Sequence, residues 1–422
     1  MPCTTILVGK KASYDGSTII ARNDDSGSGH YTSKKLAVIK PEEQPKIYKS
    51  VISHVEIELP ENPMRYTAMP NAEEGEGIWA ACGVNEAHVG MTATETITSN
   101  PRVLGADPLV RYQPAKDGKE EIPGGIGEED IVYIVLPYIH SAREGVKRLG
   151  SLLEQYGTYE MNGIAFQDAD EIWWLETIGG HHWIARKVPD DVYVMMPNQF
   201  GMDQFDLEDA LSNQKEYMCS ADLKEFVKKY HLNLSQDGTF NPRDIFGSHD
   251  DSDHVYNTPR AWYMARCLNP STMNWDGPDA GEDSRAIEWV AFASNVFNTA
   301  VPFYTDVEKV PEYFSNTTGD ASTDNFYWAS RMIAAMADAS YSKSIFHIER
   351  YQERVMSKGH EYINQYDELL SKESNAEERM QLRQEANEKI ADMVKKETQD
   401  TLNKVLYELS NQMKNAYSRS DA

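Results

Sequence analysis

Cys-Thr-Thr-Ile-Leu-Val-Gly-Lys (residues 3–10) and Thr-Ile-Ile-Ala-Arg-Asn-Asp-Asp (18–25) are separated by the polar turn Ala-Ser-Tyr-Asp-Gly-Ser (12–17). Two apolar runs with Asp-Gly in the turn between them are typical of a β-hairpin. Pairing across a turn centred near residues 13–15 returns Arg22 to the level of Cys3. The stretch therefore predicts a strand pair with a thiol at one end.

Cys3 has two interpretations. A cysteine at the start of an apolar strand is ordinarily a small buried hydrophobe. If Met1 and Pro2 are removed, however, one residue carries both a thiol and a free α-amine, and the amine pKa of about 7.7 to 8 suits a thiol pKa near about 8.5. Residues 1–2 are therefore predicted to be a propeptide, removed by autocatalysis or by a peptidase that takes Met-Pro as a unit.

The returning strand supplies polar side chains that can surround Cys3, namely Arg22, Asn23 and Asp25. A guanidinium beside a thiol favours the thiolate, and a carboxylate can hold an ammonium group. A second interpretation of Arg22 is a solvated charge at a strand end, paired with Asp24 or Asp25.

The two strands together resemble the opening of the dipeptidase A family of cysteine peptidases, which are N-terminal-nucleophile hydrolases. Secernins, penicillin V acylase and bile salt hydrolase have more distantly similar openings. The resemblance covers about the first 300 residues and continues, in order, through Gly-Val-Asn-Glu-Ala-His-Val-Gly-Met-Thr-Ala-Thr-Glu-Thr (83–96), Trp-Trp-Leu-Glu-Thr-Ile-Gly-Gly-His-His-Trp (173–183), Met-Pro-Asn-Gln-Phe (196–200) and Tyr-Asn-Thr-Pro-Arg-Ala-Trp (256–262).

This resemblance implies an α+β fold, a four-layer αββα sandwich in which two antiparallel sheets face each other. It also implies a dipeptidase that acts on dipeptides with a free amino terminus, with Cys3 as nucleophile, its own α-amine as general base and a thioester intermediate. The substrate is then a dipeptide or another small amide.

The same resemblance implies further site residues. Arg22 and Asp25 flank the nucleophile, Asn198 donates to the oxyanion, and Arg260 is a second, distal arginine. From the residues alone, Asn198 is equally a turn asparagine after Pro197, and Arg260 a partner of the preceding acidic run.

Residues 83–96 are expected to line the substrate cleft. Asn23, Thr94 and Glu95 are the candidate substrate-binding residues. Glu95 could receive the ammonium group of a dipeptide, or it could equally be a carboxylate on the surface of a strand.

Charge and cysteine content exclude several classes of protein. With 41 basic and 67 acidic residues the net charge is −26, which disfavours nucleic acids and anionic membranes as partners. No secretory signal and no apolar run of about 20 residues is present, so a cytoplasmic location is expected. The four cysteines have no CxxC spacing, so neither a disulfide framework nor a cysteine zinc site is predicted.

Hydrophobic periodicity predicts the regular elements. Residues 78–82 and 88–94 form a strand pair turning at Asn85-Glu86, and residues 163–167, 172–177 and 182–187 form a meander. Helices are expected at 128–138 and at 141–156, the second with Ser141 and Glu144 in capping-box spacing.

The C-terminal part has a different composition. A catalytic core is predicted over residues 3–345, followed by a helical region over 346–422 with a turn at 371–378. The apolar positions Ile390, Val394, Leu402, Val405, Leu409 and Met413 have helical spacing. This stripe packs against the core, or against another copy of the chain as a homo-oligomer.

The sequence is also compatible with competing functions. His249-Asp250-Asp251-Ser252-Asp253-His254 and His181-His182 offer metal ligands, but HExxH is absent, so a metallodipeptidase is disfavoured. Gly124-Gly125-Ile126-Gly127 lacks the P-loop lysine. No cofactor or metal is predicted. An amidase or acylase of N-acyl amino acids, or a secernin-like protein without peptidase activity, would fit the same opening motif.

Overall fold

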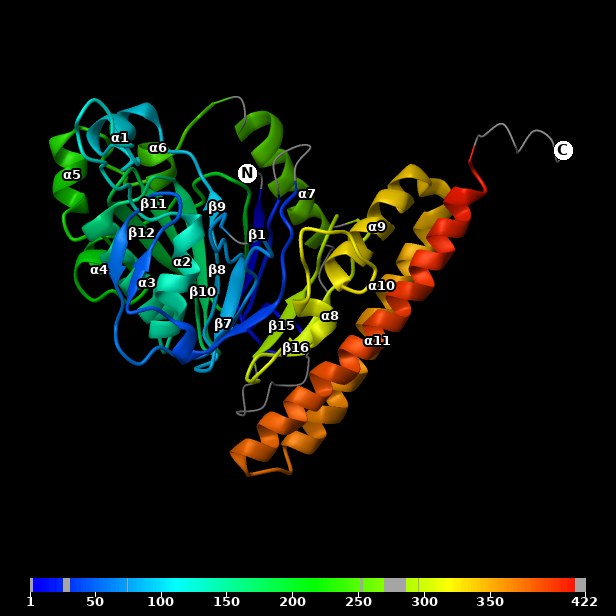
Figure 1. Cartoon of the computed structure of the whole chain (residues 1–422). Helices are drawn as coiled ribbons and strands as arrows, with labels where there is room; N and C mark the ends of the chain where they lie inside the picture. The colour runs from blue at the N-terminus through cyan, green and yellow to red at the C-terminus, as the bar shows by residue number, and fades with distance from the viewer. Residues whose placement is uncertain are drawn as a thin grey trace. The chain divides into compact units, whose positions relative to one another are not determined.

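The computed structural model describes residues 3–25, 31–73, 75–250, 253–268, 286–294 and 296–413. Met1 and Pro2, the predicted propeptide, lie outside these ranges. The chain groups into two units, the first of residues 1–31, 39–66 and 75–284 and the second of residues 32–38, 67–74 and 285–422. The structure is α+β, with a large antiparallel sheet and long C-terminal helices (Figure 1), which confirms the predicted class.

The small sheet of the first unit contains the predicted hairpin. Strand β1 (Thr4–Val8) pairs antiparallel with β2 (Ile19–Asn23) and with β13 (Tyr193–Met196). The register places Arg22 opposite Thr5. In the turn, Gly16 has a φ of 79°, which glycine adopts at little cost. The hairpin prediction is therefore confirmed, including the return of Arg22.

The large sheet of the first unit contains the predicted meander. Its strands follow the order β14-β12-β11-β10-β8-β7, and β9 also pairs with β10. The bounds are β7 Cys82–Asn85, β8 Gly90–Thr92, β9 Glu95–Thr96, β10 Asn162–Gln167, β11 Ile172–Ile178, β12 His182–Val188 and β14 Tyr217–Cys219.

The strand pair around Asn85 is shorter than predicted. Pairing joins Cys82 to Thr92 and Val84 to Gly90, so β7 begins later than residue 78. The Asn85 side chain organises the turn, because its Oδ1 accepts hydrogen bonds from the amides of Ala87 and Val89, both at 3.0 Å. The turn position is as predicted and the strand lengths are not.

One hydrophobic cluster joins the two sheets of the first unit. It contains Leu7 from β1 together with Ala165, Trp174 and Ile184 from the large sheet, all nearly inaccessible to solvent. Phe200, just after β13, belongs to the same cluster. Burial of such side chains contributes about 1.5 to 3 kcal/mol each, so this core holds the hairpin against the large sheet.

Helix α3 (Ala142–Tyr156) packs on β10, β11 and β12 (Figure 1). It begins as predicted, with the Ser141 hydroxyl accepting a hydrogen bond from the Glu144 amide. The Glu144 carboxylate bonds the His140 amide at 2.7 Å. A Cβ atom at Gly150 would lie 2.3 Å from the Trp183 ring, so glycine allows the helix to approach the sheet.

Helix α2 precedes α3, and shorter elements complete the first unit. Their bounds are η1 Pro41–Glu43, β4 Ile47–Lys49, β5 Glu56–Glu58, α1 Pro101–Ala106, α2 Glu128–Val135, η2 Leu136–Tyr138, α4 Leu207–Leu211, α5 Leu223–Lys229, α6 Pro242–Phe246, the π-helical turn η3 Asp253–Asn257 and α7 Thr258–Leu268. β3 (Ala37–Ile39) and β6 (Tyr66–Ala68) span points where the chain passes between the units. Helix α7 contacts β13 of the small sheet.

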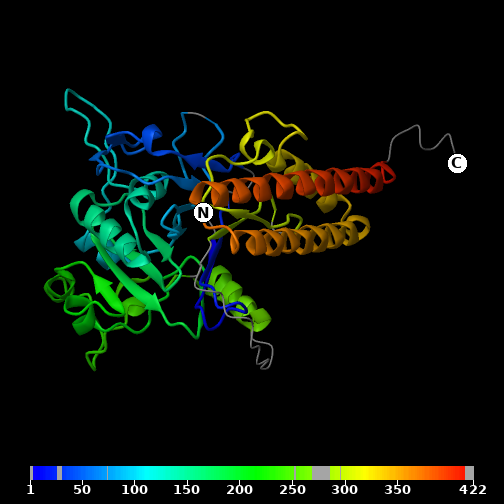
Figure 2. The same cartoon turned by 90° about the horizontal axis from the view of Figure 1, so that it is seen from below.

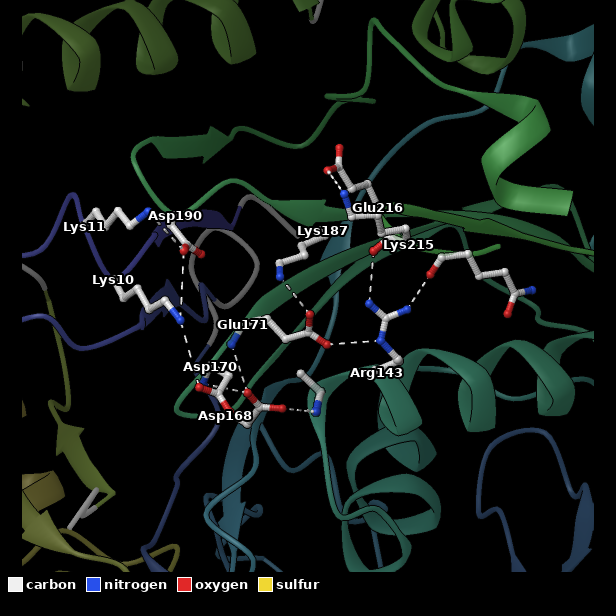
Figure 3. Close-up of polar contacts among 12 residues, drawn as sticks. Lys10, Lys11, Arg143, Asp168, Asp170, Glu171, Lys187, Asp190, Lys215 and Glu216 are labelled. Atoms are coloured by element: carbon white, nitrogen blue, oxygen red, sulfur yellow. Dashed lines mark hydrogen bonds and ion pairs between the residues drawn. The ribbon is translucent and has the colours of Figure 1, made fainter. Parts of the chain in front are cut away.

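Figure 3 shows a charged network at the turns that lie at the Val8 end of β1. Lys10 Nζ is 3.9 Å from carboxylate oxygens of both Asp170 and Asp190. Glu171 is bonded by Arg143 at 3.3 Å and by Lys187 at 3.0 Å. The Lys10 contacts are long and partly exposed, and ion pairs near the surface contribute about 0 to 1 kcal/mol each, whereas Glu171 is more buried and is held by two cations.

The second unit contains the long helices. α10 (Tyr341–Leu370) and α11 (Ala376–Ser410) lie side by side (Figures 1 and 2), joined by residues 371–375 inside the predicted turn. The remaining elements are β15 Ile287–Val290, β16 Val301–Tyr304, α8 Glu312–Ser315 and α9 Phe326–Ala339.

The predicted apolar stripe of α11 is buried at Ile390, Val394, Leu402 and Val405, whereas Met413 is exposed. Within the second unit, α11 packs on α9, α10 and β16. None of the described helices has the length and apolar character needed to span a bilayer.

Candidate active site

Cys3 lies directly before β1 and is 1 % exposed. Arg22 of β2 donates from Nη2 to the Cys3 Sγ at 3.2 Å. The same nitrogen donates to Glu128 Oε1 at 2.8 Å and to Asp24 Oδ1 at 3.4 Å. The buried guanidinium therefore interacts with the thiol and with two carboxylates at the same time.

The pKa of the Cys3 thiol is raised above its ordinary value. Burial is the largest cause, and the Arg22 charge and the Asp25 backbone amide oppose it. The carboxylates of Glu128 and Asp24 raise the pKa further. Although a guanidinium does lie beside the sulfur, the thiol is protonated near neutral pH, so attack by this sulfur requires a base.

Arg260, in the first turn of α7, connects Cys3 to Asn198. Its Nη1 donates to the Cys3 carbonyl oxygen at 2.7 Å and to Thr4 Oγ1 at 2.6 Å. Its Nη2 donates to Asn198 Oδ1 at 2.7 Å and to Asn257 Oδ1 at 2.9 Å. One planar cation with fixed donor geometry therefore sets the position of Asn198 relative to the start of β1.

Asn198 follows β13, which pairs with β1, so the sheet itself returns this residue to Cys3. Its φ of 43° lies in the left-handed region, which asparagine tolerates better than most residues. The side-chain Nδ2 donates to the Thr96 carbonyl at 2.9 Å, and the backbone amide donates to Glu95 Oε1 at 2.6 Å. These contacts hold the amide side chain in one orientation.

Two buried carboxylates hold the loop that contains Asn198. Glu95 of β9 and Glu176 of β11 both lie opposite Gly163 of β10, and residues in register share one face of a sheet. Glu95 bonds the Asn198 amide, and Glu176 accepts from the Gly201 amide at 2.7 Å. The loop is thus held near both ends. Burial raises the pKa of each carboxyl to about 7.

Glu95→Gln is expected to stabilise the protein at pH 8 and to change its stability little at pH 5. The pKa of Glu95 rises from 4.5 to about 7 on folding. Protonation of Glu95 therefore contributes fully to the free energy of unfolding below pH 4.5, and this contribution is lost as the pH rises through about 7. A shift of this size corresponds to about 3 kcal/mol. Glutamine can keep the bond to Asn198 without the charge.

The measurement is the melting temperature of both proteins at pH 5 and pH 8. Glu61→Gln is the matched control, because Glu61 is exposed. An equal difference between Glu95→Gln and the wild type at both pH values would show that Glu95 does not titrate in this range.

The structure brings most of the predicted site residues together. Cys3, Arg22, Asn198, Arg260 and Glu95 are joined by the contacts described above. Three predicted residues, Asn23, Asp25 and Thr94, take no direct part in these contacts. The Asp25 carboxylate accepts a hydrogen bond from Asn23 Nδ2 at 3.1 Å, and the buried Thr94 hydroxyl has no hydrogen-bond partner among the described residues. The backbone amide of Asp25, rather than its carboxylate, acts on the sulfur.

Several residues at the site were not predicted. Glu128 begins α2 and is only 6 % exposed, although three consecutive acidic residues at a helix start are typical of a solvated first turn. Asn257 lies within the stretch 256–262 and could have been noted there. Glu160, which accepts the Glu128 amide, and Asn162, which bonds Glu160, had no sequence signal.

His181 and His182, which were considered as metal ligands, both contact Asp107 in the structure, and His249 lies 3.9 Å from Asp244. Asp107 Oδ1 lies 2.9 Å from Nδ1 of His181, and Asp107 Oδ2 lies 2.7 Å from Nδ1 of His182. Of the run 249–254, Asp251 and Ser252 lie outside the described residues. Gly127, the last glycine of the cluster 124–127, is the N-cap residue of α2.

A family model described as peptidase family C69 matches residues 2–279 and 277–354. The chain is 47% identical over its full length to a dipeptidase of Bifidobacterium longum (strain NCC 2705), all of which is covered. It is 47% identical to a probable dipeptidase A of Streptococcus pyogenes serotype M3, again over 100% of both, and 37% identical to dipeptidase A of Lactobacillus helveticus over 96% of both. The chain is therefore a peptide hydrolase. It belongs to peptidase family C69.

Proposed function

We propose that this protein is a dipeptidase with Cys3 as nucleophile and the α-amine of Cys3 as general base. The observation that carries the proposal is Arg260, which bonds both the Cys3 carbonyl and the Asn198 side chain. The names of the curated relatives supply the substrate class. Because the pKa of the Cys3 thiol is raised, the sulfur needs a base to remove its proton before it can attack.

The reaction follows from these groups. Cys3 Sγ attacks the scissile carbonyl carbon while the thiol proton passes to the α-amine. The tetrahedral intermediate collapses with breakage of the C–N bond, and the α-ammonium returns the proton to the departing amine. Water, deprotonated by the same α-amine, then cleaves the thioester and releases the acid and the free thiol.

Asn198 is proposed to donate to the oxyanion. Its Nδ2 carries two N–H groups, and a side-chain amide keeps the same charge over the working pH range. Arg260 and Glu95 are positioning residues for Asn198. Arg22 remains next to the sulfur, where its charge favours the thiolate once the proton has left.

The proposed fold is the αββα sandwich of N-terminal-nucleophile hydrolases. The cluster between the two sheets, α3 on the large sheet and α7 on the small sheet support it. The mechanism also requires cleavage directly before Cys3, so that its nitrogen becomes a free amine.

A thiol alkylator is expected to abolish dipeptide hydrolysis, whereas a chelator is expected to leave it unchanged. The experiment should use a background with Cys267→Ser and Cys82→Ser, because Cys267 is exposed and Cys82 is half-buried, whereas Cys219 is buried like Cys3. Hydrolysis of dipeptides is measured after each treatment, and the alkylated residue is located by peptide mapping. Activity that survives alkylation of Cys3 but is lost to the chelator would contradict the proposal.

A further inference from the structure

A dipeptidase must recognise the α-ammonium group of its substrate close to the nucleophile. The ammonium nitrogen is separated from the scissile carbonyl carbon by one Cα atom. With the sulfur about 3 to 3.5 Å from that carbon, the ammonium lies about 5 to 6 Å from Sγ, and its acceptors about 8 Å away at most. Any anionic subsite must therefore border Cys3 and Arg22.

Glu95, the residue that the sequence suggests for this role, already has a partner. Its Oε1 accepts the Asn198 amide at 2.6 Å, and the residue is 1 % exposed. Thr5 and the charges of Arg22 and Arg260 also act on this carboxyl. Its Oε2 has no hydrogen-bond partner among the described residues, but an ammonium group bound to this buried carboxylate would act directly on the contact that positions Asn198.

Glu128 and Glu160 offer a second anionic group at the site. Glu128 Oε1 and Cys3 Sγ bond the same nitrogen of Arg22, so they are separated by no more than two hydrogen-bond lengths. Glu160 Oε2 accepts the Glu128 amide at 3.3 Å at the start of α2 (Figure 1). No described lysine, arginine or histidine forms an ion pair with Glu160.

Asn162, the first residue of β10, supplies an independent observation. Its Nδ2 donates to Glu160 Oε2 at 3.2 Å, so its side chain points toward Glu160. Its Oδ1 is buried without a hydrogen-bond partner among the described residues, and the residue is 1 % exposed. A buried acceptor without a donor costs about 1 to 3 kcal/mol, and a ligand with N–H groups would remove that cost.

The geometry points to Glu160, Asn162 and Glu128 as the subsite that binds the α-ammonium group of an unblocked dipeptide. An ammonium group has three N–H donors and no acceptor, and these side chains supply two carboxylates and the unpartnered Asn162 Oδ1 as acceptors. Glu128 adjoins the reacting sulfur, Glu160 provides the charge that Arg22 does not neutralise, and Asn162 Oδ1 provides a neutral acceptor. This inference rests on the proposed function and adds the origin of its preference for a free amino terminus.

Glu160→Gln is the variant that separates binding from folding. Glutamine can still accept the Glu128 amide and can donate to Asn162 Oδ1, so the hydrogen bonds are kept or improved. Burial raises the pKa of Glu160, so loss of the charge is not expected to destabilise the protein. Glu61→Gln, an exposed substitution of the same chemistry, is the control.

The measurement is kcat and KM for alanylalanine and for N-acetyl-alanylalanine, with the melting temperature of each protein. For Glu160→Gln, KM for the free dipeptide is expected to rise about 10- to 100-fold, with kcat and the melting temperature little changed. The acetylated substrate, which has no ammonium group, should be affected little. The preference for the free dipeptide should therefore narrow by the same factor.

Three results would overturn the inference. An unchanged KM in an active protein would remove Glu160 from the subsite. An equal loss on both substrates would mean that Glu160 acts through Cys3 instead, which the rate of Cys3 alkylation would also reveal. If the wild type cleaved neither substrate, or only the acetylated one, the proposed function itself would fail.

Discussion

Cys3→Ala is expected to lower kcat/KM for a dipeptide by about 10⁴-fold or more, because it removes the proposed nucleophile. The binding groups around Arg22, Asn198 and Arg260 are untouched by this change. Substrate or product should therefore still bind, and the loss should appear in kcat. Steady-state kinetics together with equilibrium binding of a product amino acid measure the two effects separately.

Cys219→Ala is the matched control for this substitution. Cys219 is also buried, and burial raises the pKa of its thiol to about 12, so it is an inert structural cysteine. Its replacement should cost some stability and leave kcat nearly unchanged. A Cys3→Ala protein that kept a tenth of wild-type activity would rule out Cys3 as the nucleophile.

Asn198→Gly is expected to lower kcat by about 10²- to 10³-fold, the usual effect of removing one oxyanion donor. Glycine is the informative replacement because the backbone φ of Asn198 is 43°, a conformation that glycine adopts freely. The loop held by Glu95 and Glu176 should therefore keep its shape. KM should change much less than kcat, because the oxyanion exists only in the transition state.

Asn198→Ala provides the comparison. It removes the same amide but, unlike glycine, keeps a Cβ atom at a positive φ, which costs about 1 to 2 kcal/mol relative to glycine. Both variants should lose similar activity and the same side-chain hydrogen bonds to Thr96 and Arg260, and Asn198→Ala should be the less thermally stable of the two. Full activity in Asn198→Gly would contradict the oxyanion role.

Local patterns in the sequence were sufficient for the secondary structure around the site. The hairpin with Asp15-Gly16, the meander after residue 162 and the Ser141 cap all depend on neighbours a few residues apart. The position of Asn198 was reached by resemblance, and the pairing of β13 with β1 explains it. The predicted strand ends were less accurate, because the Asn85 side chain holds the turn and so determines where the pairing of the two strands ends.

Contacts between residues far apart in the sequence could not be predicted from such local patterns. Glu128 is buried because Arg22, 106 residues earlier, bonds it, and no local signal records that pairing. Asn162 looks like an ordinary strand residue in the sequence, and only the structure shows its bond to Glu160. Likewise, residues 32–38 and 67–74 group with residues 285–422, which a change in composition along the chain does not indicate.

The N-terminal residue of the active protein tests the central claim most directly. The α-amine of Cys3 can act as a base only if the peptide bond before it has been cleaved, because an amide nitrogen cannot accept the thiol proton. Mass spectrometry of the N-terminal peptide from fully active protein is expected to show a chain that begins at Cys3. Fully active protein that retains Pro2 would contradict the account.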